Sequence, residues 1–194
     1  MTIQLIAIGA SLGGLEALEV LLAGLPKNFP VPVAIVQHRY KSSDKKLRVA
    51  LQQYSALVVI EPQDKEEIVP GYIYLAPADY HLMVEVKSDT VGYPSFSLCV
   101  DAPVTYTRPS IDVLFETAAD TYAEKLIGVL LTGANHDGKQ GMRKIKARGG
   151  KTVVQEPSTA TCPTMPKAAI AAGVADKVLP LADIAPYLVK ICHF

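Results

Sequence analysis

A serine enclosed by glycines, in the segment GASLGG at residues 9–14, constrains the fold of this chain more than any other feature. The segment follows an apolar run at residues 3–8 and precedes four leucines at helical spacing, Leu15, Leu18, Leu22 and Leu25. This order predicts a strand, a sharp turn and a helix, the repeating unit of an open α/β sheet. Because ligands bind at the carboxyl ends of such strands, Ser11 is expected beside a helix N-terminus, where backbone N–H groups favour negative charge.

Two other interpretations use the same glycines. A dinucleotide-binding turn, G-x-G-x-x-G, requires glycine where Ser11 stands and an acidic residue near the end of the second strand. The apolar run at residues 33–36 is followed instead by Gln37, His38 and Arg39, which argues against a nucleotide site. A serine that merely caps the helix is the other alternative, and only residues elsewhere in the chain can decide it.

His38 and Asp137 follow other predicted strands. His38 comes directly after the β-branched run at residues 33–36, and Asp137 ends the segment TGANHD that follows the apolar run at residues 126–131. Three parallel strands would therefore bring Ser11, His38 and Asp137 to one edge of the sheet. Acyl transfer by a serine needs this set, because a base takes the hydroxyl proton and a carboxylate orients the imidazole.

Two further kinds of hydrolytic site are less consistent with these residues. The order Ser, His, Asp differs from that of the α/β-hydrolases, and no strands precede that of Ser11 to supply the oxyanion loop of that fold. A cluster of His38, His136 and Asp137 could bind a metal ion and activate water. No third histidine or carboxylate stands at the usual ligand spacing, so neither a metal nor a cofactor is expected.

The remaining pattern predicts one doubly wound α/β domain over residues 1–194, with a mostly parallel sheet, helices on both faces and an antiparallel hairpin insertion. Further strands are expected at 57–60, 72–75, 82–86, 96–100 and 151–155, with those at 72–75 and 82–86 paired antiparallel. Helices are expected at 138–148, at 183–191 with a bend or break at Pro186, from Pro109 in a first turn, and after a cap at Ser42 or Ser43.

Six ordered groups of residues carry a family resemblance: IGAS at 8–11 with GG at 13–14, VQH at 36–38, PGYIYLAP at 70–77, RPSIDVLF at 108–115, LTG at 131–133 with DG at 137–138, and MP at 165–166 with AA at 168–169. Together they resemble the catalytic domain of the bacterial chemotaxis methylesterases, the CheB family, over nearly the whole chain. The resemblance implies hydrolysis of glutamyl methyl esters on the cytoplasmic domain of methylated chemoreceptors, and in many members deamidation of receptor glutamines. It also implies Ser11 as nucleophile, His38 as general base and acid, and Asp137 as the orienting carboxylate.

The expected lining of the cleft departs from the family pattern. Leu12 stands where threonine is usual, Arg39 where methionine is common, and Ala134 with Asn135 where Met-Gly is usual. Residues 161–164, TCPT, replace an apolar approach that ends in glycine. These departures bear on substrate preference, and they motivate two alternatives: a catalytically idle module that docks receptor or regulatory helices, and an esterase for a substrate outside chemotaxis.

Backbone N–H groups at Leu12 and Gly13 are expected to hold the oxyanion, since this contact does not depend on the side chain. Arg39 and Arg108 are the cations nearest the expected site in sequence. They would either steer an acidic receptor helix to the cleft or lie on the surface as solvated side chains. His81 is expected to make a structural hydrogen bond.

Regulation by an attached domain is not expected from this sequence. Family members generally carry a phosphorylatable receiver domain ahead of the esterase domain, whereas this chain begins two residues before its first predicted strand. If the sequence is complete, the enzyme would be constitutive or controlled by a separate receiver or regulatory protein.

Composition supports a cytoplasmic location. Lysines and arginines number 19, as do aspartates and glutamates, so the charge gives no basis for nucleic-acid binding. No apolar run approaches the ~20 residues that span a bilayer, and no signal peptide is evident, so no membrane insertion is expected. The three cysteines form no C-x-x-C pair and are expected to be reduced thiols.

Overall fold

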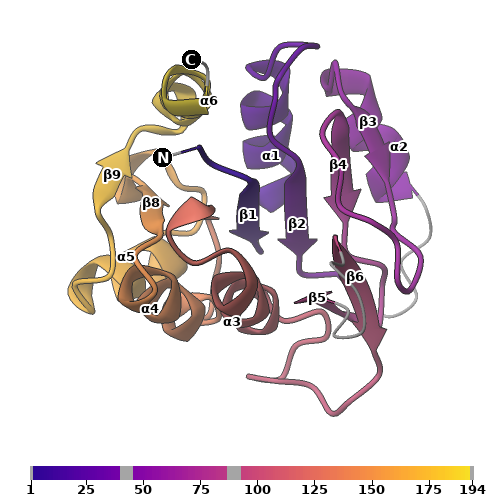
Figure 1. Ribbon diagram of the computed structural model, residues 1–194. Coiled ribbons are helices and arrows are strands. Elements are labelled where there is room, and N and C mark those ends of the chain that lie inside the picture. The colour runs from indigo at the N-terminus through magenta and orange to yellow at the C-terminus, as the bar shows by residue number, and fades with distance from the viewer. Residues whose placement is uncertain (1, 40–45, 87–92, 193–194) are drawn as a thin grey trace.

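The computed structural model describes residues 2–39, 46–86 and 93–192. Seven strands form one parallel sheet in the order β3-β4-β2-β1-β7-β8-β9 (Figure 1). Their bounds are β1 Leu5–Ala10, β2 Val33–Gln37, β3 Val58–Ile60, β4 Tyr72–Leu75, β7 Leu126–Leu130, β8 Lys151–Gln155 and β9 Lys177–Leu179. The strand order reverses direction at β1, which places a topological switch point between β1 and β7.

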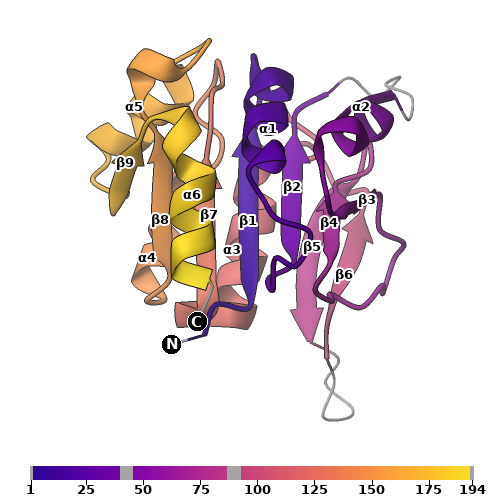
Figure 2. The same ribbon diagram turned by 90° about the horizontal axis from the view of Figure 1, so that it is seen from above.

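Helices cover both faces of this sheet, as the doubly wound prediction requires. Their bounds are α1 Gly14–Ala23, α2 Lys46–Tyr54, α3 Ile111–Tyr122, α4 Lys139–Ala147, α5 Thr164–Ala171 and α6 Leu181–Cys192. Figure 2 looks onto the face covered by α1, α2 and α6, with α3 and α4 behind the sheet. The observed architecture confirms the predicted fold class.

Alternation along β1 explains how one strand supports two cores. All six of its residues are buried. Ile6 and Ile8 pack in the core under α1 and α6. Leu5 and Ala7 pack in the other core, under α3 and α4. A strand buried on both faces reads as a continuous apolar run, which is why the sequence marked it so clearly.

The predicted pairing of the strands at 72–75 and 82–86 is wrong. Strand β4 lies between β2 and β3 and is parallel to both. The antiparallel hairpin is instead formed by β5 (His81–Val86) and β6 (Pro94–Cys99), which make a separate two-stranded sheet. Three of the four residues of β4 are buried, a pattern typical of a strand inside a parallel sheet rather than of a hairpin arm.

Two helix predictions also need correction. Helix α3 begins at Ile111 with Ser110 as its N-cap, whose hydroxyl accepts the Val113 N–H, so Pro109 precedes the helix instead of occupying its first turn. The sequence predicted a bend or a break at Pro186, and the break is absent, because helix α6 continues through this residue. Proline has no backbone N–H, so one hydrogen bond of the helix is missing at Pro186. Buried residues before and after Pro186 pack against the core, and this packing stabilises the helix despite that loss.

One expectation falls on residues that the structure does not describe, and two observed elements were not expected. The caps proposed at Ser42 and Ser43 lie outside the described residues. Helix α5 and the short strand β9 were not expected from the sequence. Across residues 2–39, 46–86 and 93–192, no helix is both long enough and apolar enough to cross a membrane.

Candidate active site

Three neighbouring strands bring the predicted catalytic residues to one edge of the sheet. Ser11 follows β1, His38 follows β2, and Asp137 lies in the loop between β7 and α4. Strand β1 lies between β2 and β7, so Ser11 is flanked on either side by the loops that carry the other two residues. Hydrogen bonds from the His38 N–H to the Ala10 carbonyl (3.0 Å) and from the Ser11 N–H to the Thr132 carbonyl (3.0 Å) extend the register past the strand ends.

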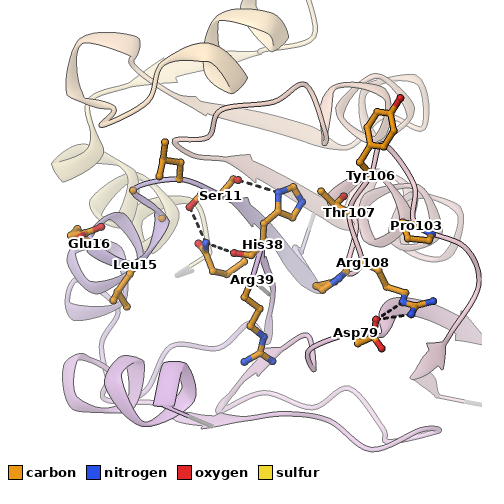
Figure 3. A pocket seen from close by; sticks show the side chains of 15 residues that line it. Ser11, Leu15, Glu16, His38, Arg39, Asp79, Pro103, Tyr106, Thr107 and Arg108 are labelled. Atoms are coloured by element: carbon orange, nitrogen blue, oxygen red, sulfur yellow. Dashed lines mark hydrogen bonds and ion pairs between the residues drawn. The ribbon is translucent and has the colours of Figure 1, made fainter. Parts of the chain in front are cut away.

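The side chains of these residues form a hydrogen-bonded chain. The Ser11 Oγ lies 3.1 Å from His38 Nδ1, and His38 Nε2 lies 2.8 Å from Asp137 Oδ2 (Figure 3 shows the serine and the histidine). A carboxylate can only accept, so Nε2 carries the proton that faces Asp137. In a neutral imidazole Nδ1 is then the acceptor, and it can take the proton of the Ser11 hydroxyl.

Asp137 is fully buried and held by many donors. Its Oδ1 accepts hydrogen bonds from the Ser110 hydroxyl and from the N–H groups of Asp112 and Gly138. Its Oδ2 accepts from His38, from the Ile111 N–H at 2.7 Å and from the Thr107 hydroxyl at 3.2 Å. The N-terminus of α3 therefore serves as an anion site for this carboxylate.

These donors keep Asp137 ionised. Burial alone would raise the pKa of the Asp137 carboxyl, because desolvation disfavours its charge. The hydrogen bonds from His38, Asp112 and Ile111 outweigh burial, and the pKa is lowered below its ordinary value. An ionised Asp137 favours one tautomer of the imidazole and would stabilise an imidazolium, which is what acyl transfer by a serine requires of such a carboxylate.

The turn that carries the serine requires its glycines. Gly13 has φ of 78°, a left-handed conformation, and a Cβ there would lie 2.4 Å from Cβ of Thr161. A Cβ on Gly133, in the neighbouring loop, would lie 2.9 Å from Cβ of Ser11. Close approach of three backbone segments thus fixes the position of the nucleophile.

Backbone donors suited to an oxyanion stand beside Ser11. Within the part of the chain that the structure describes, the N–H groups of Leu12 and Gly13 have no hydrogen-bond acceptor. Both residues line the same cavity as Ser11 and precede the first turn of α1. Free N–H groups at this place favour the negative charge that develops on a carbonyl under attack.

Gln37 is a positioning residue that the sequence analysis did not single out. Its side-chain amide donates to the carbonyl of Ser11 at 2.8 Å and to that of His38 at 3.0 Å, and so ties these two residues together. A Cβ on Gly14 would lie 1.9 Å from Gln37 Oε1, so glycine is needed there as well. The sequence did carry one indication of this role, because Gln37 is the polar last residue of a strand that is otherwise apolar and fully buried.

The loop before Asp137 contributes unequally to the site. Asn135 Nδ2 lies 3.4 Å from His38 Nδ1, and Asn135 Oδ1 accepts the Asp137 N–H at 3.1 Å. Asn135 thus contacts both the base and the orienting residue. Neither Ala134 nor Asn135 is among the residues that line the cavity, although the sequence predicts both as lining residues, and Ala134 is exposed.

The two arginines line the cavity as expected, but each is paired with a carboxylate. Arg39 Nη2 lies 2.6 Å from Glu61 and donates to the Ala76 carbonyl, and only 6% of its side chain is exposed. Arg108 pairs with Asp79 at 2.6 Å (Figure 3). Neither is a solvated surface side chain, and neither presents the unpaired charge that would steer an acidic partner.

A cavity of about 660 Å³ opens over these residues. Its lining includes Ser11, Leu12 and Gly13 after β1, His38 and Arg39 after β2, and residues 106–109 before α3. This volume lies in the range of small-molecule and side-chain binding sites. Ser11 and His38 are therefore open to a substrate while Asp137 stays buried beneath them.

The remaining histidines have other surroundings. His81 is buried, contacts the Ala102 carbonyl through Nε2 and accepts the Ser110 N–H on Nδ1, which confirms the expected structural hydrogen bond. His136 is exposed. Among residues 2–39, 46–86 and 93–192, no three His, Cys, Asp or Glu side chains gather as metal ligands.

Asp112, behind the triad, is a second buried carboxylate. Its Oδ1 accepts the Gly141 N–H at 2.7 Å. Burial raises the pKa of the Asp112 carboxyl to about 6, with a further contribution from the nearby charge of Asp137. A folded-state pKa above the unfolded value means that the folded protein loses stability as pH rises from about 4 to about 6.

Replacing Asp112 by asparagine is expected to raise the free energy of unfolding at pH 8 by ~1–3 kcal/mol. The amide oxygen keeps the bond from Gly141, while the cost of a buried charge disappears. Urea denaturation between pH 4 and pH 8 measures this effect, and the variant should show the flatter profile. Asp120→Asn is the matched control of opposite sign, because ion pairs with Lys144 and Arg148 lower the pKa of Asp120. If the unfolding free energy of Asp112→Asn changed with pH as steeply as that of the wild type, or more steeply, this account would be contradicted.

Known proteins share the sequence and the fold. The model of the CheB methylesterase family matches residues 6–188. A putative protein-glutamate methylesterase/protein-glutamine glutaminase of Leptospira interrogans is 45% identical over 191 residues, which cover 98% of this chain and 96% of that protein. A protein-glutamate methylesterase/protein-glutamine glutaminase of Thermotoga maritima is 37% identical over 97% of this chain, and the match spans 54% of that protein.

A solved structure has the same architecture. The crystal structure of the Thermotoga maritima CheB methylesterase catalytic domain superposes with a TM-score of 0.92 at 36% sequence identity, covering 98% of this chain and 99% of that one. The family model, the full-length match to the Leptospira protein and this structure agree with one another. The chain belongs to the CheB methylesterase family.

Proposed function

We propose that this protein hydrolyses glutamate methyl esters on the cytoplasmic domain of chemoreceptors, with Ser11, His38 and Asp137 as its catalytic triad. The observation that carries the proposal is the chain of contacts from Ser11 Oγ to His38 Nδ1 (3.1 Å) and from His38 Nε2 to the buried Asp137 (2.8 Å). Membership of the CheB methylesterase family and the names of the relatives support the same reaction.

The first half-reaction forms an acyl-enzyme. Ser11 Oγ attacks the ester carbonyl carbon as its proton moves to His38 Nδ1, and Asp137 stabilises the resulting imidazolium. The N–H groups of Leu12 and Gly13 hold the oxyanion. When the tetrahedral intermediate collapses, the C–OCH₃ bond breaks and the methoxy oxygen takes the proton from Nδ1, so methanol leaves.

The second half-reaction restores the serine. Water attacks the acyl carbon while its proton moves to Nδ1, and the Ser11 Oγ then leaves and recovers that proton. The product is a glutamate carboxylate on the substrate protein. Deamidation of glutamine follows the same steps with ammonia as the first leaving group, in agreement with the double name of the relatives.

The proposal extends to the setting of the reaction. Residues 1–194 act as a single catalytic domain, in the cytoplasm, without a cofactor, a nucleic-acid partner or membrane insertion. The match of the family model to residues 6–188 supports the first of these points.

Product analysis tests the proposed reaction. The wild-type protein is incubated with a receptor cytoplasmic fragment that a methyltransferase has methylated, and mass spectrometry follows individual side chains. We expect methylated glutamates to become glutamates, and glutamines at the same kind of position to be deamidated. A folded protein that leaves both side chains unaltered would overturn the proposed substrate, and a test on small esters would then show whether esterase activity remains.

A further inference from the structure

A tight turn at residues 104–107 holds an aromatic side chain at the rim of the active-site cavity. The Val104 N–H donates to the Thr107 carbonyl (3.1 Å) and the Thr107 N–H to the Val104 carbonyl (2.9 Å), which closes a two-residue loop. Tyr106 lies in this loop, is 100% exposed and lines the cavity. In Figure 3 it stands beside Thr107, across His38 from Ser11.

The backbone of this turn is strained. Thr105 and Tyr106 have φ of 49° and 65°, as both central residues of such a turn must. Asn and Gly normally occupy these positions, and a β-branched or bulky residue there is an outlier. Neither packing nor solubility explains a tyrosine at this place, because its ring is in water and its backbone conformation is unfavourable.

The turn is fixed to the catalytic machinery on its C-terminal side. The Thr107 hydroxyl lies 3.2 Å from Asp137 Oδ2 and 2.9 Å from the Val104 carbonyl. Arg108, the next residue, donates to the carbonyls of Val100 (2.6 Å) and Asp101 (2.8 Å) at the start of the same loop. The position of Tyr106 relative to His38 is therefore set by hydrogen bonds at both ends of the loop.

We propose that Tyr106 is a specificity-determining residue whose ring contacts the polypeptide flanking the glutamate methyl ester, so that esters on a protein are preferred over small esters. The inference rests on the proposed function. Only a short side chain separates the reacting carbonyl from the backbone of the substrate, so the substrate protein must lie against the rim when the ester reaches Ser11. Leu12, 59% exposed, lies next to Ser11 and offers a second apolar surface on the lining of the same cavity.

The class of partner follows from the character of this rim. A tyrosine has few side-chain torsions, so this exposed ring on a hydrogen-bonded turn offers a large contact area at little entropic cost, and tyrosine is enriched among the residues that dominate protein interfaces. The cavity's two arginines are already paired with Glu61 and Asp79, so they offer no unpaired cation for the ester group or its neighbours. The rim therefore suits a protein segment with apolar side chains beside the methylated glutamate.

The test compares two substrates with the protein of residues 1–194. Methanol release gives kcat/KM for a methylated receptor fragment and for N-acetylglutamate γ-methyl ester, and their ratio measures the preference for protein. We expect Tyr106→Ala and Tyr106→Asn to lower this ratio about tenfold, the effect of removing an aromatic interface residue. Tyr106→Phe should keep the ratio within about twofold, because the ring makes the contact. Tyr93→Ala is the control, as Tyr93 is exposed but does not line the cavity.

The asparagine variant separates recognition from folding. Asparagine tolerates the left-handed conformation, so Tyr106→Asn should keep or raise the melting temperature while the ratio falls. A ratio that stays unchanged in both variants would overturn this inference and leave the proposed function intact. The same holds if kcat/KM falls equally for both substrates, because an equal fall would indicate a structural effect through Thr107. Failure of the wild type to release methanol from either substrate would overturn the inference and the proposed function together.

Discussion

Replacing His38 by alanine is expected to lower kcat for methyl ester hydrolysis by about five to six orders of magnitude. The imidazole is the only base in contact with Ser11 Oγ among the described residues, and it must both take a proton from the serine and give it to the leaving methoxide. Without it the hydroxyl stays protonated and a poor nucleophile. Methanol release under saturating substrate measures the loss.

Two comparisons make the His38 result specific. Free imidazole should restore part of the activity of His38→Ala, because the cavity that the side chain leaves opens to solvent beside Ser11. His136→Ala serves as the control, since His136 is exposed on the loop next to Asp137 and contacts none of the triad. Activity of His38→Ala near that of the wild type would remove the histidine from the mechanism.

Asp137→Asn is expected to lower kcat by about four orders of magnitude and to destabilise the fold. A carboxylate can only accept a hydrogen bond, so it keeps the proton of His38 on Nε2 and leaves Nδ1 free to act as the base. An asparagine amide can also donate, so this tautomer is no longer enforced. The amide must also place an NH₂ group against donors at the N-terminus of α3, because both carboxylate oxygens accept N–H groups there. Leaving buried donors unpaired costs about 1–3 kcal/mol each.

Activity and stability of the Asp137 variant are measured separately. Urea denaturation gives the stability, and kcat is taken under conditions where the variant is folded. Asp176→Asn is a matched control, because Asp176 accepts hydrogen bonds from the Thr152 N–H and hydroxyl and contacts no triad residue. A folded Asp137→Asn protein with normal kcat would contradict the assigned role.

The fold, and the meeting of Ser11, His38 and Asp137 at one edge of the sheet, could be predicted because both rest on local patterns. Residues 3–8, 33–36 and 126–131 are apolar runs of the kind that parallel sheets bury on both faces, and a catalytic side chain follows each strand. Parallel strands align their carboxyl ends, so the three side chains had to share one edge. No tertiary contact had to be guessed for this step.

The hydrogen-bond donors that hold Asp137 could not be predicted from local sequence patterns. The donors that hold Asp137 come from Thr107, Ser110 and the first turn of α3, more than two dozen residues earlier in the chain. Ser110 carried a usable N-cap signal, but its second bond to Asp137 depends on how α3 packs. The partners of Arg39 and Arg108 are similarly distant, which is why their charges seemed available for steering.

The hairpin error has the same origin. Strands that are neighbours in sequence often pair, which favoured an antiparallel pair between residues 72–75 and the strand that follows at 82–86. Tyr72–Leu75 instead inserts between two parallel strands, which only the order of the whole sheet determines. Periodicity identifies strands more reliably than it identifies their partners.

The most direct test of the account is methanol release from a methylated receptor fragment, measured side by side for the wild type and Ser11→Ala. The account predicts release by the wild type and a loss of about five to six orders of magnitude in the variant, with an unaltered melting temperature. Ser97→Ala, a serine on β6 outside the cavity, should match the wild type. Equal release by the wild type and a folded Ser11→Ala protein would contradict the covalent mechanism, and no release by either would contradict the proposed substrate.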